Sequence, residues 1–223
     1  MAKIEAVLFD LDGTLIDTAP DMAAALNNLL QQHEQNPLPF ATIRNVVSKG
    51  SIALVRLGFG ADIAIAQLES LQQQFLQLYA DALCVESKLF AGMAELLDTL
   101  EQHSISWGIV TNKPGWLTKP LLEQMQLWQR ASCVVSGDDL PRRKPYPDPL
   151  LHACETIGCQ PAQTIYIGDD QRDIDAGLAA GTQTLIALYG YIDDHEPVQD
   201  WGADGMINSV DELHSWLNSG KFN

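Results

Sequence analysis

Two aspartates follow the first apolar run of the chain and have the spacing needed for phosphate chemistry. Asp10 and Asp12 lie in Phe9-Asp10-Leu11-Asp12-Gly13-Thr14, at the end of the mostly apolar run 4–9. Two such carboxylates on a bending chain can face one cavity, where one attacks phosphorus and the other protonates the leaving oxygen. Gly13 permits a tight turn that brings backbone amides close to a phosphate. Alone, an Asp-Gly pair is equally typical of a solvated surface turn.

Three polar side chains further along can bind a phosphoryl group. Thr111 and Asn112 follow the apolar residues 107–110 and offer a hydroxyl and an amide. Lys144 lies in a loop where Pro145 and Pro147 restrict the backbone. A fixed ammonium group beside carboxylates keeps them ionised and stabilises a pentavalent phosphorus. Taken singly, Thr-Asn is also a common helix cap, and the lysine loop is also compatible with a solvated basic loop.

A further acidic group predicts a magnesium site. Asp169, Asp170 and Asp173 follow the apolar residues 164–167. Magnesium is usually held by one or two carboxylates together with substrate phosphate and water. An acidic helix N-terminus is the alternative explanation, and it would suffice for Asp170. In combination, the clusters predict a nucleophile, an acid/base group, phosphate ligands and a metal site.

Short apolar runs alternate with amphipathic stretches, which is the pattern of a parallel sheet covered by helices. The predicted strands are residues 4–9, 107–110, 133–135, 164–167 and 185–188, with a weaker sixth at 206–207. The predicted helices are residues 92–102, 117–126, 149–157, 170–180 and 211–217. Ligands bind at the carboxyl ends of the strands in such sheets. A Rossmann-like α/β core would therefore gather the polar clusters at one edge.

The stretch from residue 18 to residue 88 interrupts this alternation. It contains no predicted strand, and helical spacing covers residues 20–32, 42–57 and 62–79. Pro20 suits the first turn of a helix. We therefore expect a helical cap (18–88) inserted after the first strand of a catalytic core (1–17 and 89–223), with hinges near 16–19 and 86–90.

The composition of the chain narrows the classes of molecule that it is expected to bind. The chain has 223 residues and a net charge of −16, which disfavours nucleic acid and anionic membranes because both attract lysine and arginine. No apolar run is long enough to span a bilayer, and Asp10 interrupts the N-terminal run far short of a signal sequence. We expect a cytoplasmic protein. Arg142-Arg143-Lys144 is the only dense basic cluster, so it is the candidate for local attraction of an anionic substrate.

The cysteines predict neither a disulfide nor a zinc site. Cys84, Cys133, Cys154 and Cys159 form no CxxC pair and have no matching group of histidines. In a reducing compartment such thiols are usually plain buried side chains. Free cysteines are therefore expected.

The order DxDGT, TN, a lysine in a KP loop and GDxxxD resembles the haloacid dehalogenase superfamily of phosphohydrolases over essentially the whole chain. The resemblance implies that Asp10 is the nucleophile and forms an aspartyl-phosphate. It implies that Asp12 is the general acid and then the general base. Thr111, Asn112 and Lys144 would bind the transferring phosphoryl group.

The same resemblance implies a Mg²⁺ ion. Its ligands would be Asp10, the backbone carbonyl of Asp12 and Asp169, with Asp173 in support. Whether Asp170 or Asp173 touches the ion directly stays open.

Within the superfamily the chain most resembles the phosphoglycolate phosphatase group, and some stretches resemble bacterial N-acetylmuramic acid 6-phosphate phosphatases. The first resemblance is carried by residues 14, 17–18, 110–113 and 189–191, and the second by residues 92–97, 168–174 and 201–204. The implied substrate is a small phosphate monoester, either 2-phosphoglycolate or a carboxylated sugar phosphate. Asp170 and Lys49 depart from the usual phosphoglycolate pattern, which leaves the substrate open.

A cap loop reads the leaving group in this family. The resemblance therefore makes Arg44 and Lys49, in residues 44–50, candidates for binding a substrate carboxylate. A basic, solvated helix end is the alternative explanation for both residues.

Two other functions stay open. A phosphosugar mutase of the same superfamily also uses an aspartyl-phosphate, although Thr14 favours hydrolysis. A non-enzymatic phosphoacceptor would also combine strand-end aspartates, a threonine and a lysine, but Asp12 and the cap-sized insert oppose it. Monomer and homodimer are both compatible with the sequence.

Overall fold

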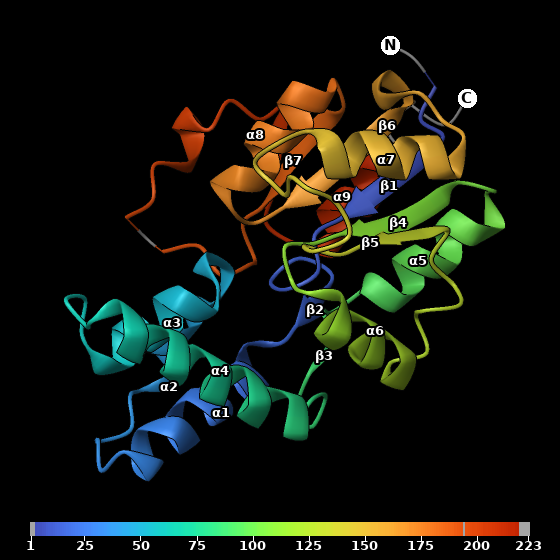
Figure 1. The fold of residues 1–223 in the computed structure, drawn as a ribbon. Helices are drawn as coiled ribbons and strands as arrows, with labels where there is room; N and C mark the ends of the chain where they lie inside the picture. The colour runs from blue at the N-terminus through green and yellow to red at the C-terminus, as the bar shows by residue number, and fades with distance from the viewer. Residues whose placement is uncertain (1–2, 194, 219–223) are drawn as a thin grey trace.

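The computed structural model describes residues 3–193 and 195–218, and its centre is a six-stranded parallel sheet (Figure 1). The strand order is β5-β4-β1-β6-β7-β8. The strands are β1 Ala6–Phe9, β4 Ser106–Val110, β5 Cys133–Val135, β6 Thr164–Gly168, β7 Gln183–Ala187 and β8 Gly205–Ile207. The α/β fold with a parallel sheet and a helical cap inserted after the first strand is confirmed, and the weak sixth strand is present.

Helices cover both faces of the sheet because successive strand residues point to opposite sides. Ala6 and Leu8 pack towards α7 (Asp148–Ile157) and α8 (Gln171–Ala180). Val7 and Phe9 pack towards the opposite layer, which consists of α5 (Met93–Gln102), α6 (Gly115–Gln124) and α9 (Val210–Asn218). Phe9 is fully buried, and burial of a side chain of this size stabilises a fold by about 1.5–3 kcal/mol. The sheet is thus a rigid platform for the residues at its carboxyl edge.

Four α-helices within residues 19–81 form a separate group beside the sheet (Figure 1). They are α1 Ala19–Gln32, α2 Phe40–Arg44, α3 Ser51–Phe59 and α4 Ile65–Asp81. Leu26 and Leu29 of α1 share one apolar core with Leu71 and Phe75 of α4. We call residues 19–81 the helical insert. Over the described residues, no helix is long and apolar enough to cross a membrane.

The predicted helical segment at residues 42–57 was wrong as a single element. The chain leaves α2 after Arg44, makes a short 3₁₀ turn at Val47–Lys49 and enters α3 at Ser51. Gly50 has φ +87°, a conformation that glycine adopts without strain and other residues rarely reach. The apolar spacing continues through the break, so periodicity alone does not reveal it. The break produces a loop between α2 and α3.

A two-stranded antiparallel ribbon connects the helical insert to the sheet, and the sequence did not predict it. β2 (Ile16–Asp17) pairs with β3 (Lys88–Leu89). Two-residue strands carry no recognisable period. Buried Asp21 at the start of α1 accepts hydrogen bonds from the backbone N–H groups of residues 85–87 at 2.9–3.0 Å. The two linking segments are therefore held side by side.

The thiols differ in accessibility. Cys84 is partly exposed, whereas Cys133, Cys154 and Cys159 are buried. Burial raises the pKa of Cys133 to about 12 and that of Cys154 to about 11. Because the thiolate is the reactive form, we expect one thiol of the native protein to react with Ellman's reagent at about pH 8. The other three should react only after denaturation, and rapid labelling of a Cys84→Ser variant would contradict this.

Candidate active site

Three neighbouring strands end at the same edge of the sheet and present the polar residues that the sequence singled out. β1 pairs with β4 on one side and with β6 on the other. Asp10 follows β1, Thr111 follows β4, and Asp169 follows β6. Because the chain continues to opposite sides of β1, a crevice forms at this edge, as in other open parallel sheets.

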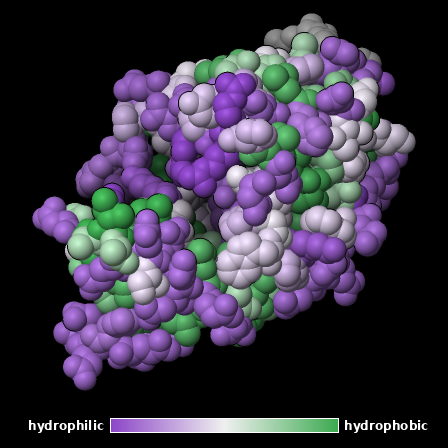
Figure 2. All heavy atoms as spheres, viewed as in Figure 1, coloured by the Kyte–Doolittle hydropathy of each residue, from purple (hydrophilic) through white to green (hydrophobic). Residues whose placement is uncertain are grey.

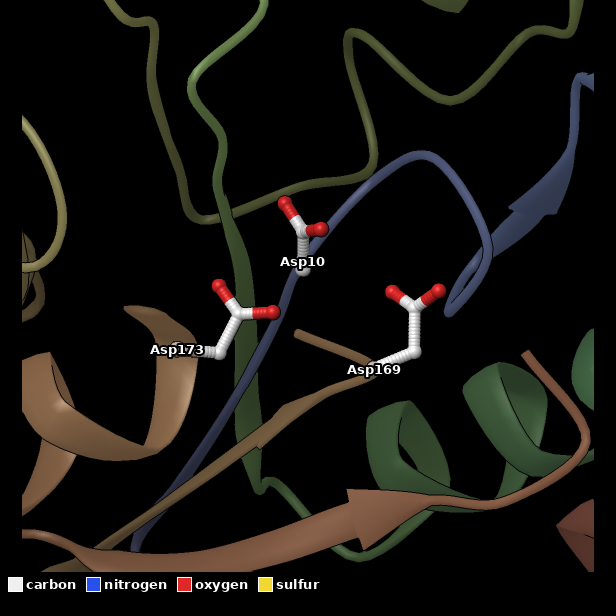
Figure 3. Close-up of side chains that lie close together, drawn as sticks. All are labelled: Asp10, Asp169 and Asp173. Carbon is white, nitrogen blue, oxygen red and sulfur yellow. The ribbon is translucent and has the colours of Figure 1, made fainter. Parts of the chain in front are cut away.

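Three carboxylates meet in this crevice. Oxygen atoms of Asp10, Asp169 and Asp173 lie within 4.8 Å of one another, and the side chains face one space (Figure 3). They are only 8%, 2% and 1% exposed. Burial raises the pKa of Asp10 to about 7, with Lys144 opposing the rise, and burial raises the pKa of Asp169 well above its usual range. This set of hard oxygen donors carries an excess of negative charge, and it fits a divalent cation such as Mg²⁺.

Lys144 is the cation inside the carboxylate group. Its Nζ lies 2.7 Å from Asp10 Oδ1 and 2.7 Å from Asp173 Oδ1, and it donates to the Tyr166 hydroxyl at 2.8 Å. Burial lowers the pKa of Lys144, but the neighbouring carboxylates outweigh that effect and raise it. The lysine is therefore held charged beside Asp10.

Asp12 lies next to this group with its own partners. Its carboxylate accepts hydrogen bonds from Thr18 Oγ1 at 2.7 Å and from Lys113 Nζ at 2.8 Å. Lys113 Nζ also donates to the Tyr79 hydroxyl of α4 at 3.0 Å. Sequence reasoning assigned no role to Lys113, although its position directly after Asn112 was a usable signal. Its contacts orient Asp12 and connect it to the helical insert.

The loop created by the break between α2 and α3 contacts Asp169. Ser48 Oγ donates to Asp169 Oδ2 at 2.7 Å, and the Tyr191 N–H donates to the same oxygen at 2.8 Å. Thr14 Oγ1 donates to Oδ1 at 3.0 Å. Gly13, with φ +88°, passes so close that a Cβ there would overlap the Asp169 carboxylate. The sequence analysis placed Ser48 in the cap loop at residues 44–50 but assigned a role there only to the basic side chains.

The predicted phosphate ligands lie beside Lys144. Thr111, Asn112 and Lys144 all line one cavity with Asp10 and Asp12. The Asn112 Nδ2 donates to the Lys144 backbone carbonyl at 3.1 Å. Among the described residues, the buried Asn112 Oδ1 has no hydrogen-bond partner. Asn112 therefore supports the lysine loop as well as facing the cavity.

The two candidate cap residues differ in position. Lys49 lines the cavity and forms an ion pair with Glu196 at 2.6 Å. Arg44 donates to the Tyr189 carbonyl at 3.0 Å and lies 5.0 Å from the centre of the Tyr191 ring. Arg44 is not among the described residues that line the cavity. The structure thus brings Lys49, but not Arg44, to the site.

Asp170 has a structural role. It caps the N-terminus of α8 by accepting from the Arg172 N–H at 2.9 Å, and its carboxylate pairs with the Arg172 guanidinium at 2.7 Å. Arg172 in turn contacts the Ser48 carbonyl. Asp170 is thus engaged by Arg172, and it is not one of the three clustered carboxylates.

The cavity has a volume of about 280 Å³ and lies between the core and the helical insert. Figure 2 shows hydrophilic residues gathered on the core side of the hollow between these two parts. The insert contributes an apolar wall of Met22, Ile52, Phe75 and Leu76. The arrangement suits a substrate with an anionic end beside Lys144, Thr111 and Asn112 and a less polar part against the insert.

The chain belongs to the haloacid dehalogenase-like hydrolases, since residues 7–187 match that family. It is 40% identical to an N-acetylmuramic acid 6-phosphate phosphatase of Pseudomonas putida, over 97% of each chain. It is 44% identical to a phosphoglycolate phosphatase of Xanthomonas campestris, over 93% of this chain and 94% of the relative. A crystal structure described as a predicted phosphoglycolate phosphatase from Haemophilus somnus superposes with a TM-score of 0.85 at 26% identity, covering 97% of this chain and 99% of the other.

Within that family the chain is a phosphatase, as these relatives are. The resemblance drawn from the motifs is therefore confirmed at the level of the family. Membership of a hydrolase family also opposes the non-enzymatic phosphoacceptor.

Proposed function

We propose that the protein hydrolyses a small phosphate monoester with Mg²⁺ as cofactor, through an aspartyl-phosphate on Asp10. The observation that carries the proposal is the buried group of Asp10, Asp169 and Asp173 around Lys144, open to a cavity of about 280 Å³. Few structural roles account for three buried carboxylates with one cation, because burying uncompensated charge is costly.

In the first step an Asp10 oxygen attacks phosphorus, and the bond from phosphorus to the leaving oxygen breaks. Lys144 binds Asp10 Oδ1 at 2.7 Å, which leaves the other oxygen, Oδ2, as the attacking atom. Asp12 transfers its proton to the leaving oxygen. Lys144, Thr111 and Asn112 stabilise the charge on the phosphoryl oxygens.

In the second step water attacks the phosphorus of the aspartyl-phosphate. Asp12, now ionised, accepts the proton of that water, and the bond from phosphorus to Asp10 breaks. Phosphate and the free Asp10 carboxylate are the products. Thr18 and Lys113 hold Asp12 in one orientation for both proton transfers.

The Mg²⁺ ligands in this proposal are Asp10, the Asp12 backbone carbonyl and Asp169, with Asp173 in support. When bound, the ion supplies positive charge that offsets the phosphate and carboxylate charges. The oxygen donor set suits this hard cation, and the raised pKa of Asp10 and Asp169 in its absence supports the assignment.

We further propose that residues 18–88 act as a cap over a core of residues 1–17 and 89–223. The β2–β3 ribbon is the connection about which such a cap would open to admit substrate and close to exclude water. Lys49, which lines the cavity, is the cap residue that we expect to face the substrate. The net charge of −16 supports a small molecule, rather than nucleic acid, as the partner in the cytoplasm.

The proposed substrates are 2-phosphoglycolate and carboxylated sugar phosphates such as N-acetylmuramic acid 6-phosphate. The names of the two relatives at 44% and 40% identity support this choice. Both compounds combine a phosphate monoester with a carboxylate.

Phosphate release from a panel of monoesters tests the proposal. With Mg²⁺ present, we expect faster phosphate release from one of the two carboxylated compounds than from hexose phosphates or nucleoside monophosphates. In EDTA the rate should fall at least about a hundredfold, because the ion offsets charge in the transition state. Full activity in EDTA would refute the metal dependence. p-Nitrophenyl phosphate hydrolysed with no sugar present separates a hydrolase from a mutase, which needs a phosphorylated activator.

A further inference from the structure

The cations that line the cavity are almost all paired with carboxylates. Over residues 3–193 and 195–218 the lining cations are Lys49, Lys113, Arg143, Lys144 and Arg172. Four of them have a carboxylate within ion-pair distance: Lys49 with Glu196, Lys113 with Asp12, Lys144 with Asp10 and Asp173, and Arg172 with Asp170. In this part of the chain Arg143 is the lining cation with no such partner.

Arg143 is placed at the rim of the cavity by the residue that follows it. Lys144 is buried, with its Nζ on Asp10 and its backbone carbonyl held by Asn112 at 3.1 Å. Arg143 itself is exposed and lines the same cavity. An arginine next to a fixed lysine can reach a second group of a substrate whose phosphate lies at Asp10.

The neighbouring arginine has a different environment. Arg142 donates to Asp148 Oδ1 at 2.8 and 3.0 Å, and its guanidinium lies 5.0 Å from the centre of the Tyr146 ring. Arg142 is not a lining residue of the cavity. The basic cluster of the sequence therefore divides into a paired surface arginine, an unpaired arginine at the cavity and a buried lysine at Asp10.

We propose that the Arg143 guanidinium binds the carboxylate of the leaving group and thereby selects carboxylated phosphate monoesters. The inference rests on the proposed function of the same site. Lys144, Thr111 and Asn112 already serve the phosphoryl group, so Arg143 is available for a second anion. Its planar fork of N–H donors matches a carboxylate in two parallel hydrogen bonds. In a protein of net charge −16, an unpaired cation at the mouth also offsets the repulsion of a substrate that carries both a phosphate and a carboxylate.

The test compares substrates that differ in the carboxylate. N-Acetylmuramic acid 6-phosphate is paired with N-acetylglucosamine 6-phosphate, which lacks the lactyl group, and 2-phosphoglycolate is paired with p-nitrophenyl phosphate. The quantity compared is kcat/KM for the carboxylated compound divided by kcat/KM for its partner. In the pair for which wild type prefers the carboxylated compound, Arg143→Ala should lower this ratio about 10- to 100-fold. The loss should come mainly from a higher KM, as for a lost charge-assisted hydrogen bond. The ratio for Arg143→Lys should lie between those of wild type and Arg143→Ala, because lysine keeps the positive charge but lacks the planar pair of N–H donors.

Arg142→Ala is the matched control, since it removes the same side chain one position away. It should leave the ratio unchanged. Two results would overturn the role of Arg143 without affecting the proposed phosphatase activity. One is an unchanged ratio in Arg143→Ala. The other is a wild-type enzyme that hydrolyses monoesters with no preference for the carboxylated member of either pair. Wild-type protein with no activity on any monoester would instead refute the proposed function itself.

Discussion

Asp10→Asn protein is expected to release phosphate at least about 10⁴-fold more slowly than wild type, a loss of the size seen when other enzymes lose their nucleophile. The amide cannot attack phosphorus, and no neighbouring carboxylate can take its place. Both oxygens of Asp169 accept hydrogen bonds, from Thr14, Ser48 and Tyr191. Asp173 contacts Lys144 and accepts a hydrogen bond from the Asp170 N–H.

The same substitution should leave folding intact or improve it. Asp10 is buried with Asp169 and Asp173, and desolvation and repulsion both oppose its ionisation. Replacing it with a neutral amide relieves that repulsion, while Lys144 keeps Asp173 as a partner. We therefore expect the free energy of unfolding to stay within about 1 kcal/mol of wild type or to rise.

Single-turnover phosphate release and urea denaturation measure the two effects. Asp98→Asn is the matched control, because Asp98 is on α5, pairs with Arg130 and lies outside the cavity. It should change neither quantity appreciably. An Asp10→Asn enzyme that keeps more than about a tenth of wild-type turnover is incompatible with covalent catalysis by this residue.

Lys144→Met is expected to lower the free energy of unfolding by about 3–5 kcal/mol in metal-free buffer, as when one partner of a buried ion pair is removed. Lys144 is 3% exposed and within 2.7 Å of two carboxylates. Without it, Asp10, Asp169 and Asp173 are left with no cation among them. Activity should fall as well, by at least about 10³-fold, because both the phosphoryl group and Asp10 lose their positive partner.

Urea denaturation of four proteins tests this prediction: wild type, Lys144→Met, Asp10→Asn and the double variant. If the lysine acts through the carboxylates, the double variant should be less destabilised than the sum of the single changes, with a coupling of about 0.5–3 kcal/mol. Lys119→Met serves as the control, since Lys119 is exposed, lies 3.9 Å from Glu123 and 5.6 Å from the centre of the Trp128 ring, and has no buried ion pair among the described residues. A loss below about 1 kcal/mol in Lys144→Met, no greater than for an ordinary surface change, would contradict the charge balance described here.

The core of the fold was predictable from local patterns. β1, β4, β5 and β6 lie where near-continuous apolar runs predicted strands. A strand buried on both faces must be apolar throughout, so its sequence carries the information. Elements with weak periodicity were not predictable. The β2–β3 ribbon has two residues in each strand, and the turn at Val47–Lys49 interrupts helical spacing that continues on both sides.

The residues of the site likewise include some that the sequence predicts and some that it does not. The types and order of Asp10, Asp169 and Lys144 are properties of the sequence, and a parallel sheet must bring residues after adjacent strands to one edge. Partners from separate elements are not encoded by local spacing. Ser48 reaches Asp169 because the helical insert lies against the core, and Lys113 reaches Asp12 because the segments after β4 and β1 meet within the core.

For the basic residues the tertiary structure was decisive. The sequence by itself determined that the chain has an α/β core, strand-end carboxylates and one dense basic cluster, because these follow from composition and period. It did not determine which cations are neutralised. Arg44 lies on Tyr189 and Tyr191, Arg142 pairs with Asp148, and Arg143 remains at the cavity. Side chains this long can reach partners on other segments, as Arg44 reaches Tyr189, so only the packing of the folded chain decides where each charge lies.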